Sequence, residues 1–293
     1  MKFVELILLF AVLFMFGCGQ QAELGTKKNP IKMYFVPAIE ADKIITGGKE
    51  VADIITEKTG YYFHVKVPTS YASVIEAMGT EETDIAWLAT YAYILANQKF
   101  GAEVALTVVR KGFDKYRGQF IARSESNINC LEDIEGKIIA YTDAASTSGY
   151  IYPSALLIRK GIKPGKYFFA GGHPQAVLAV YGGKADVGCA FWTPVGEEGN
   201  HDARDMVLDT HPDVMEKIKI VGFTDWIPNA TVTFRKDFPP EMKEKIVNAL
   251  LEFANDDEDR ATLKELLEID NFIRASDEDY DSVRKALKTI GED

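Results

Sequence analysis

Positive charge is scarce in this chain. Its 293 residues hold 33 lysines and arginines against 44 aspartates and glutamates, which gives a formal net charge of -11. Such a surface repels polyanions, so we expect no nucleic-acid partner and no polybasic contact with a membrane. If the protein binds an anion, local hydrogen-bond donors and helix dipoles must hold it, because the overall field opposes binding.

Cysteine is also rare, and the familiar catalytic motifs are missing. The three cysteines form no CxxC pair and no Cys/His spacing typical of zinc. Cys189 lies in an apolar run, which favours buried packing, and a disulfide between Cys130 and Cys189 is left open. The chain contains no H-E-x-x-H, no G-x-S-x-G and no Walker loop. We therefore expect no metal, no cofactor and no enzyme, with an enzyme on the same fold as the alternative.

Long hydrophobic runs are absent except at the N-terminus. Residues 6–16 are wholly apolar, and Gly17 and Cys18 follow them. Such a run is too short to span a membrane as a helix and is typical of a signal peptide. Gly17-Cys18 resembles a lipoprotein cleavage site, so we predict a signal peptide at residues 1–17 and lipidation of Cys18. A plain signal peptide or an uncleaved anchor is the alternative, and residues 18–29 are predicted to be a polar tether.

The remainder of the chain alternates between strand-like and helix-like segments. Strands are expected at residues 31–36, 62–67, 84–88, 103–109, 119–123, 137–141, 167–170 and 185–191. Helices are expected at residues 46–59, 70–78, 91–98 and 174–181, after Ser148, and at 241–255 and 256–267. This rhythm predicts an α/β protein with largely parallel sheets. We place a first lobe at residues 30–112, a second lobe at 113–222 and a return to the first lobe at 223–293, with crossings near 111–118 and 222–226.

Four strand-to-helix junctions share one design. They are Pro68-Thr69-Ser70-Tyr71, Trp87 to Tyr91, Ser146-Thr147-Ser148-Gly149, and Gly171-Gly172-His173-Pro174. Ser70, Thr90 and His173 are expected to be N-caps, and Pro174 suits the first helical position. Any one junction can be structural, but Ser146 to Ser148 put more hydroxyls beside one helix start than capping requires. Because open α/β sheets bind ligands beyond the carboxyl ends of their strands, these junctions predict a shared anion site.

These junctions also carry a family resemblance. The chain resembles the periplasmic phosphonate/phosphate/phosphite-binding proteins of ABC transporters, which have the type II two-lobed fold. The matching segments are Pro68–Ala72, Asp84–Trp87, Ser146–Gly149 with Pro153, Gly172–Val180, Ala185–Val187, Ile227-Pro228 and Arg235-Lys236. The resemblance implies two α/β lobes that close on a small oxyanion.

The same resemblance implies ligand contacts from Tyr71, Ser146, Thr147, Ser148 and His173. Thr90 and Tyr91, at the second junction, are predicted contacts as well. Tyr91 stands in for a tyrosine-glycine pair that some members carry where this chain has Leu88 and Ala89. Members that hold an aminoalkyl phosphonate need carboxylates at positions that fall here on Thr193 and Ala230. The resemblance therefore implies phosphate, phosphite or a short alkyl phosphonate.

The wider setting also follows from the resemblance. It implies an exported, lipid-anchored, monomeric binding protein that delivers its ligand to an ABC permease. The competing hypothesis is a sensor ectodomain or a binder of another small anion, such as a sulfonate.

Overall fold

The computed structural model describes residues 22–37, 41–196 and 199–291. Within these ranges no helix is long and apolar enough to cross a membrane. The predicted signal peptide and Cys18 lie outside the described residues.

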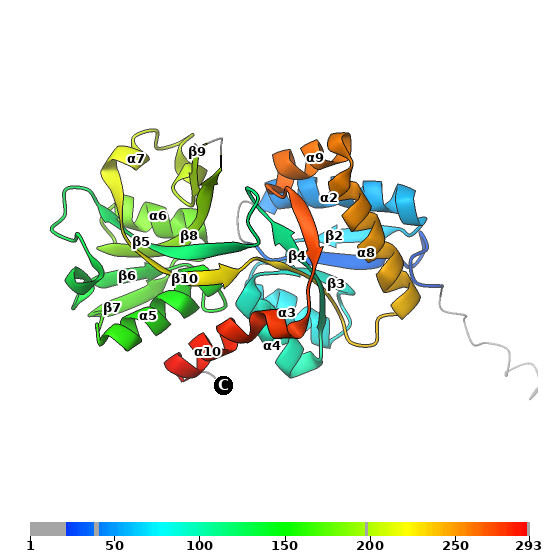
Figure 1. The fold of residues 1–293 in the computed structure, drawn as a ribbon, viewed down its shortest axis with the longest axis horizontal. Coiled ribbons are helices and arrows are strands. Elements are labelled where there is room, and N and C mark those ends of the chain that lie inside the picture. Colours follow the sequence, from blue (N-terminus) through cyan, green and yellow to red (C-terminus); the bar gives the residue numbers. More distant parts are fainter. Residues whose placement is uncertain (1–21, 38–40, 197–198, 292–293) are drawn as a thin grey trace, which may run out of the picture.

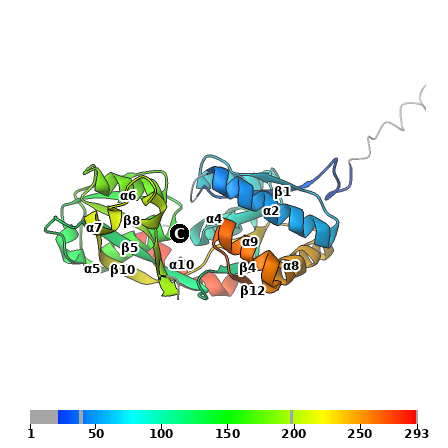
Figure 2. The same cartoon turned by 90° about the horizontal axis from the view of Figure 1, so that it is seen from above.

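Two mixed sheets form the framework, and Figures 1 and 2 show them side by side with strands running between them. The first sheet has the order β12-β4-β11-β3-β1-β2, built from β1 (Ile31–Phe35), β2 (Phe63–Lys66), β3 (Ile85–Leu88), β4 (Glu103–Val109), β11 (Thr231–Phe234) and β12 (Asn271–Arg274). The second has the order β10-β5-β8-β6-β7, with β9 paired to β8, and is built from β5 (Lys115–Arg123), β6 (Ile138–Tyr141), β7 (Lys166–Phe169), β8 (Val187–Gly196), β9 (Gly199–Asp202) and β10 (Ile218–Pro228).

Helices cover both faces of each sheet. On the first sheet, one apolar cluster packs against α2 (Ala41–Thr59), α8 (Pro240–Asn255) and α9 (Asp257–Leu267). The other face packs against α3 (Tyr71–Gly79) and α4 (Thr90–Phe100). The second sheet packs against α5 (Tyr152–Lys160) on one side, and against α6 (His173–Tyr181) and α7 (Val214–Lys217) on the other. We refer to each sheet with its helices as the first and the second lobe.

The predicted α/β two-lobed class is confirmed, but the sheets are less parallel than expected. The ladders β1–β2, β1–β3, β6–β7 and β6–β8 are parallel. The pairings of β11 with β3 and β4, and of β5 with β8 and β10, are antiparallel. The pairings of β12 with β4 and of β9 with β8 are also antiparallel, so both sheets are mixed.

The return crossing lies later than the sequence predicts. β10 stays paired with β5 as far as Pro228, so Gly222–Trp226 is part of the second sheet. The chain passes back to the first sheet at Asn229 and Ala230. The side-chain amide of Asn229 donates to the carbonyl oxygens of Val108 (3.1 Å) and Phe113 (2.9 Å), and so ties the two crossing segments together.

The C-terminal helix α10 (Asp281–Ile290) adds a further contact between the lobes. Val283 and Leu287 of α10 share an apolar cluster with Ile94 of the first lobe and Tyr152 of the second. The Tyr152 hydroxyl also lies 3.3 Å from Ser282 Oγ. Figure 1 shows α10 along the lower side of the molecule, beside α3 and α4 and reaching toward α5.

The predicted tether is only partly a tether. Residues 22–29 pack on the first lobe, since Leu24 contacts its apolar cluster and the Tyr62 N–H donates to the Gly25 carbonyl oxygen (2.8 Å). Gly25 has a φ of +85°, and an added Cβ would lie 2.9 Å from the Tyr61 ring, so glycine permits this close turn. The sequence predicted a tether because most of this stretch is polar, but the apolar Leu24 packs on the lobe.

Candidate functional site

A cavity of about 390 Å3 lies between the lobes and receives side chains from both. The first lobe contributes Tyr71 and Trp87, and the second contributes Ser146, Ser148 and His173. Pockets of this size are ordinary for small-molecule sites, which commonly lie between domains. The cavity therefore brings together all four junctions singled out in the sequence.

The serine–threonine–serine turn begins a π-helical turn, η2 (Thr147–Ile151), that continues into α5. Ser146 is its N-cap, and its Oγ accepts a hydrogen bond from the Gly149 N–H (3.1 Å), which leaves its own O–H available as a donor. Gly149 is required, because an added Cβ would lie 2.1 Å from Thr142 Oγ1. Ser146 and Ser148 line the cavity, as their predicted role requires.

Thr147 is placed between the lobes. Its Oγ1 accepts a hydrogen bond from the backbone N–H of Tyr91 in α4 (2.7 Å), and its side chain is fully buried. The cavity lining among the described residues does not include Thr147, Tyr91 or Thr90. The role of these three residues as ligand contacts therefore stays a prediction. The hydrogen bond between Thr147 and Tyr91 links the two lobes directly.

The second junction differs from its prediction. Ala89 is the N-cap of α4, in an extended conformation and with no side-chain hydrogen bond, so Thr90 is the first helical residue. The Thr90 hydroxyl donates instead to the carbonyl oxygen of Pro228 (2.6 Å), at the end of β10. The predicted N-cap role of Thr90 is wrong, because its hydroxyl is hydrogen-bonded to the crossing strand β10.

Tyr71 is the first residue of α3 and lines the cavity, and Ser70 is the N-cap as predicted, since its Oγ accepts from the Ser73 N–H (3.2 Å). Burial raises the pKa of Tyr71 far above its usual value, and the charge of Asp143 and the neighbouring Tyr116 raise it further. The phenol is therefore a neutral donor at any physiological pH.

His173 is the first residue of α6, while Gly172 occupies the cap position, so the predicted cap and the predicted position of Pro174 are each off by one residue. Its Nδ1 accepts a hydrogen bond from the Phe191 N–H (3.3 Å). Thr142 Oγ1 lies 3.3 Å from the same nitrogen, but its proton is donated to the Cys189 carbonyl oxygen (3.0 Å). Burial lowers the pKa of His173 to about 4. The ring is therefore neutral at pH 7, with its proton on Nε2, and it can act as a donor.

This assignment predicts how substitutions of His173 act on binding. His173→Ala removes the N–H donor, and we expect it to weaken binding of phosphate or methylphosphonate by about tenfold, the value of one hydrogen bond to an anion. His173→Gln keeps a donor and should lose less. Isothermal titration calorimetry measures both, and equal, negligible losses would mean that His173 has only a structural role.

The buried neutral ring also predicts a pH dependence of stability. Folding lowers the pKa of His173 from 6.5 to about 4. The contribution of this group to the free energy of unfolding is therefore fully present above pH 6.5 and is lost as the pH falls toward 4. When the pH is lowered from 7 to 5, protonation of this group should reduce the free energy of unfolding by about 2 kcal/mol. Urea denaturation of the native protein and of His173→Gln isolates the effect, because the variant retains every carboxylate. An identical pH dependence in the two proteins would contradict it.

The sequence did not identify Tyr116 as part of this site. This residue of β5 lines the cavity, and its side chain lies beside the hydroxyls of Ser148, Thr90 and Thr147. Burial raises the pKa of Tyr116, and the three hydroxyls oppose that rise only in part, so the phenol stays protonated. Tyr116 comes from the crossing strand, which begins four residues before the strand expected from the sequence.

Cationic side chains also line the cavity. Arg110 lines it and donates from Nη1 to the carbonyl oxygens of Leu267 (2.5 Å) and Glu268 (3.0 Å). Lys43, Glu265 and Glu268 also line the cavity, and all three are exposed, which places them at its mouth. The donors of the second lobe are neutral, while the mouth carries charges of both signs.

The two remaining cysteines are separate thiols. Cys130 is exposed, and Cys189 is buried in β8, where burial raises the pKa of its thiol. The disulfide that the sequence left open is not formed. Buried packing of Cys189 is confirmed. The described residues include no cluster of three or more His, Cys, Asp or Glu that could hold a metal ion.

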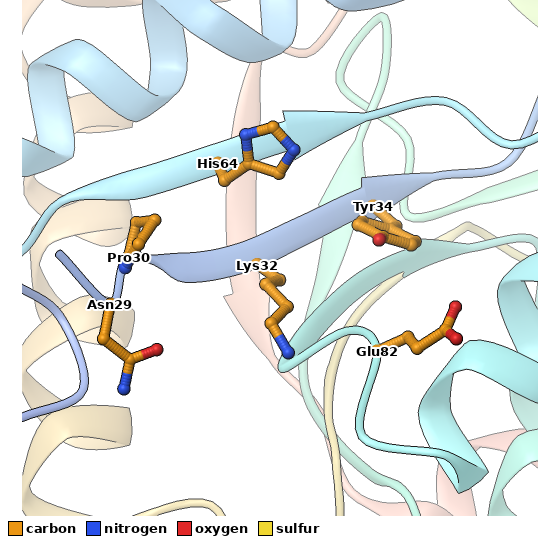
Figure 3. Close-up of a pocket in the computed structure, with 6 residues that line it drawn as sticks. All are labelled: Asn29, Pro30, Lys32, Tyr34, His64 and Glu82. Atoms are coloured by element: carbon orange, nitrogen blue, oxygen red, sulfur yellow. The ribbon is translucent and has the colours of Figure 1, made fainter. Parts of the chain in front are cut away.

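A second, more open hollow lies on the outer edge of the first sheet, lined by Asn29, Pro30, Lys32, Tyr34, His64 and Glu82 (Figure 3). Two of its polar side chains form hydrogen bonds to backbone carbonyl oxygens. Lys32 Nζ donates to the carbonyl oxygen of Glu81 (2.9 Å), and the Asn29 side chain donates to that of Ala22 (2.8 Å). His64 is exposed on β2. We assign no ligand to this hollow.

Two α/β lobes with a cavity of convergent donors between them define a type II solute-binding protein. The model of the family described as "ABC transporter, phosphonate, periplasmic substrate-binding protein" matches residues 33–280. The chain belongs to this family of periplasmic binding components, which are not enzymes.

Individual relatives agree with this classification. The chain is 28% identical to the phosphate-import protein PhnD of Mycolicibacterium smegmatis over 239 residues, which covers 77% of this chain and 72% of the relative. A binding protein of a Pseudomonas aeruginosa phosphonate ABC transporter has the same fold, with a TM-score of 0.77, 20% identity and coverage of 89% of this chain and 87% of that one. PhnD1 of Prochlorococcus marinus, solved with methylphosphonate, superimposes with a TM-score of 0.75, 15% identity and coverage of 90% and 98%.

Proposed function

We propose that this protein captures a small phosphorus oxyanion, namely phosphate, phosphite or a short alkyl phosphonate, and delivers it to an ABC permease. The observation that supports this most directly is the convergence of neutral donors on one interlobe cavity: Ser146, Ser148 and His173 from one lobe and Tyr71 from the other. Preformed neutral donors can hold a tetrahedral anion with several charge-assisted hydrogen bonds, even in a protein of net negative charge.

Calorimetric titration of residues 22–293 with phosphate, phosphite, methylphosphonate and methanesulfonate tests the ligand class. The proposal expects saturable binding of at least one phosphorus oxyanion and weaker binding of the sulfonate, since the sulfonate carries less charge. Tighter binding of methanesulfonate than of all three phosphorus compounds would favour a sulfonate binder and overturn the proposal. A sensor ectodomain would bind the same anion without supporting uptake in cells that carry the permease.

We further propose that the lobes close on the ligand about the two crossing segments. Asn229 ties these segments together, and Trp226 lies on β10 close to them, with its indole 46% exposed and the Arg117 guanidinium 5.4 Å from its ring centroid. We expect saturating ligand to reduce the radius of gyration in solution scattering and to change the emission of Trp226. An unchanged radius in the presence of a ligand whose binding is verified by calorimetry would count against closure.

We also propose that the protein acts as a monomer on a lipid anchor at Cys18, after removal of residues 1–17. The support is the apolar run and Gly17-Cys18 in the sequence. The mass of the mature protein extracted from membranes tests this, because diacylation adds a fixed mass to an N-terminal cysteine. A mature N-terminus at any other residue would contradict it.

A further inference from the structure

The interlobe cavity extends well past the oxyanion donors. Tyr71 belongs to the apolar cluster on the α3–α4 face of the first sheet. The same cavity is also lined by residues of the opposite cluster, under α2 and α9. We call this part the side chamber, and its walls are Phe35, Ile44, Trp87, Val108, Leu267 and Ile269.

The volume is too large for an inorganic anion alone. A water molecule takes about 30 Å3 of liquid. The cavity's 390 Å3 therefore corresponds to roughly a dozen waters, whereas phosphate and methylphosphonate each have five heavy atoms. Binding sites usually enclose most of their ligand's surface. The walls of the side chamber are apolar, so this part of the cavity can hold an apolar substituent attached to the oxyanion.

The chemistry of the walls defines that substituent. Phe35 and Trp87 stack with ring centroids 4.9 Å apart and are both buried, so an aromatic pair forms part of the chamber wall. Among the described residues, the Trp87 indole N–H has no hydrogen-bond partner. Thr193 and Ala230, which also line the cavity, are uncharged. The Arg110 guanidinium lines the cavity beside Leu267 and repels a second cation. An ammonium group would therefore lose hydration without gaining a buried partner.

We propose that the preferred ligand is an organophosphonate or phosphate monoester with an uncharged, mainly apolar substituent of about ring size, which occupies the side chamber. This inference rests on the proposed oxyanion function but replaces the short alkyl group of the proposed ligand by a larger substituent. Burying a ring the size of a phenyl group gives roughly a 10- to 100-fold gain in affinity. Phenylphosphonate should accordingly bind at least tenfold more tightly than methylphosphonate.

A substitution that fills the chamber tests this assignment. Ile44→Phe adds volume at a wall of the side chamber, whereas Ile158→Phe makes the same change at an exposed position of α5 and serves as the control. We expect Ile44→Phe to remove most of the advantage of phenylphosphonate while methylphosphonate affinity stays within about twofold. Ile158→Phe should change neither, and thermal denaturation verifies that both variants fold.

Tryptophan fluorescence locates the substituent independently. The chain has three tryptophans, so Trp192→Phe combined with Trp226→Phe leaves Trp87 alone. Phenylphosphonate should shift or quench the Trp87 emission more strongly than methylphosphonate. If methylphosphonate binds but phenylphosphonate gains no affinity, the side chamber assignment is wrong and the oxyanion function stands. If phenylphosphonate, methylphosphonate and phosphate all fail to bind, the side chamber assignment and the proposed oxyanion function are both wrong.

Discussion

Replacing Ser146, Thr147 and Ser148 together by alanine is expected to weaken phosphate or methylphosphonate binding at least tenfold, about 1.4 kcal/mol. Ser146 and Ser148 present hydroxyls to the cavity, and each hydrogen bond to a charged ligand contributes about 1.5–3 kcal/mol. Thr147 adds a second effect, because its hydroxyl accepts from the Tyr91 N–H of the opposite lobe. Calorimetry on the purified variant measures the loss.

Single variants separate these two effects. Ser148→Ala removes a cavity donor and leaves the Thr147 link intact. Thr147→Val removes the link and the hydroxyl beside Tyr116, and preserves the branched shape. Thr210→Ala is the control, since Thr210 is an exposed threonine of the same lobe whose hydroxyl donates to a local carbonyl oxygen. Unchanged affinity in the triple variant, with the fold intact, would exclude the turn as the anion anchor.

2-Aminoethylphosphonate is expected to bind at least tenfold more weakly than methylphosphonate. Its ammonium group needs a buried carboxylate, and the positions that would supply one, Thr193 and Ala230, line the cavity without charge. Glu265 and Glu268 also line the cavity, but both are exposed at its mouth. An unpaired buried charge costs several kcal/mol. Asp225 is exposed and pairs with Arg159 at 2.6 Å, and Glu197 lies outside the described residues. Competition titration against methylphosphonate measures the difference.

The reverse design gives a stricter test. Thr193→Glu with Ala230→Asp should raise the affinity for the amine relative to methylphosphonate. Thr193→Gln with Ala230→Asn has nearly the same shape without the charge, and should leave the preference unchanged. If the unaltered protein binds 2-aminoethylphosphonate more tightly than phosphate, phosphite and methylphosphonate, the predicted ligand class is wrong.

The sequence predicted the local parts of this fold well. Alternating patterns placed β4 at its observed bounds and most other elements within a few residues, because hydrophobic periodicity reflects which face of an element is buried. The Ser70 cap was also predicted correctly, since it depends on a hydrogen bond to Ser73, three residues away.

Features that depend on distant segments were beyond sequence reasoning. The Thr90 hydroxyl finds its acceptor 138 residues along the chain, and Thr147 pairs with an amide 56 residues away. Tyr116 enters the site only because β10 and β5 run together between the lobes. No local pattern distinguishes these partners, because the packing of the complete fold selects them.

The position of the C-terminal helix decides which residues would move most if the lobes rotated against each other. Because α10 holds both lobes through one apolar cluster along one side, a rotation of the lobes moves residues near α10 least. If the lobes close as proposed, displacement would grow with distance from that side. The rim that carries Glu265 and Glu268 of the first lobe and Met206 of the second would then travel furthest. A solute would accordingly enter past this charged rim. Spin labels placed there would detect small rotations that the same labels beside Ser282 would miss.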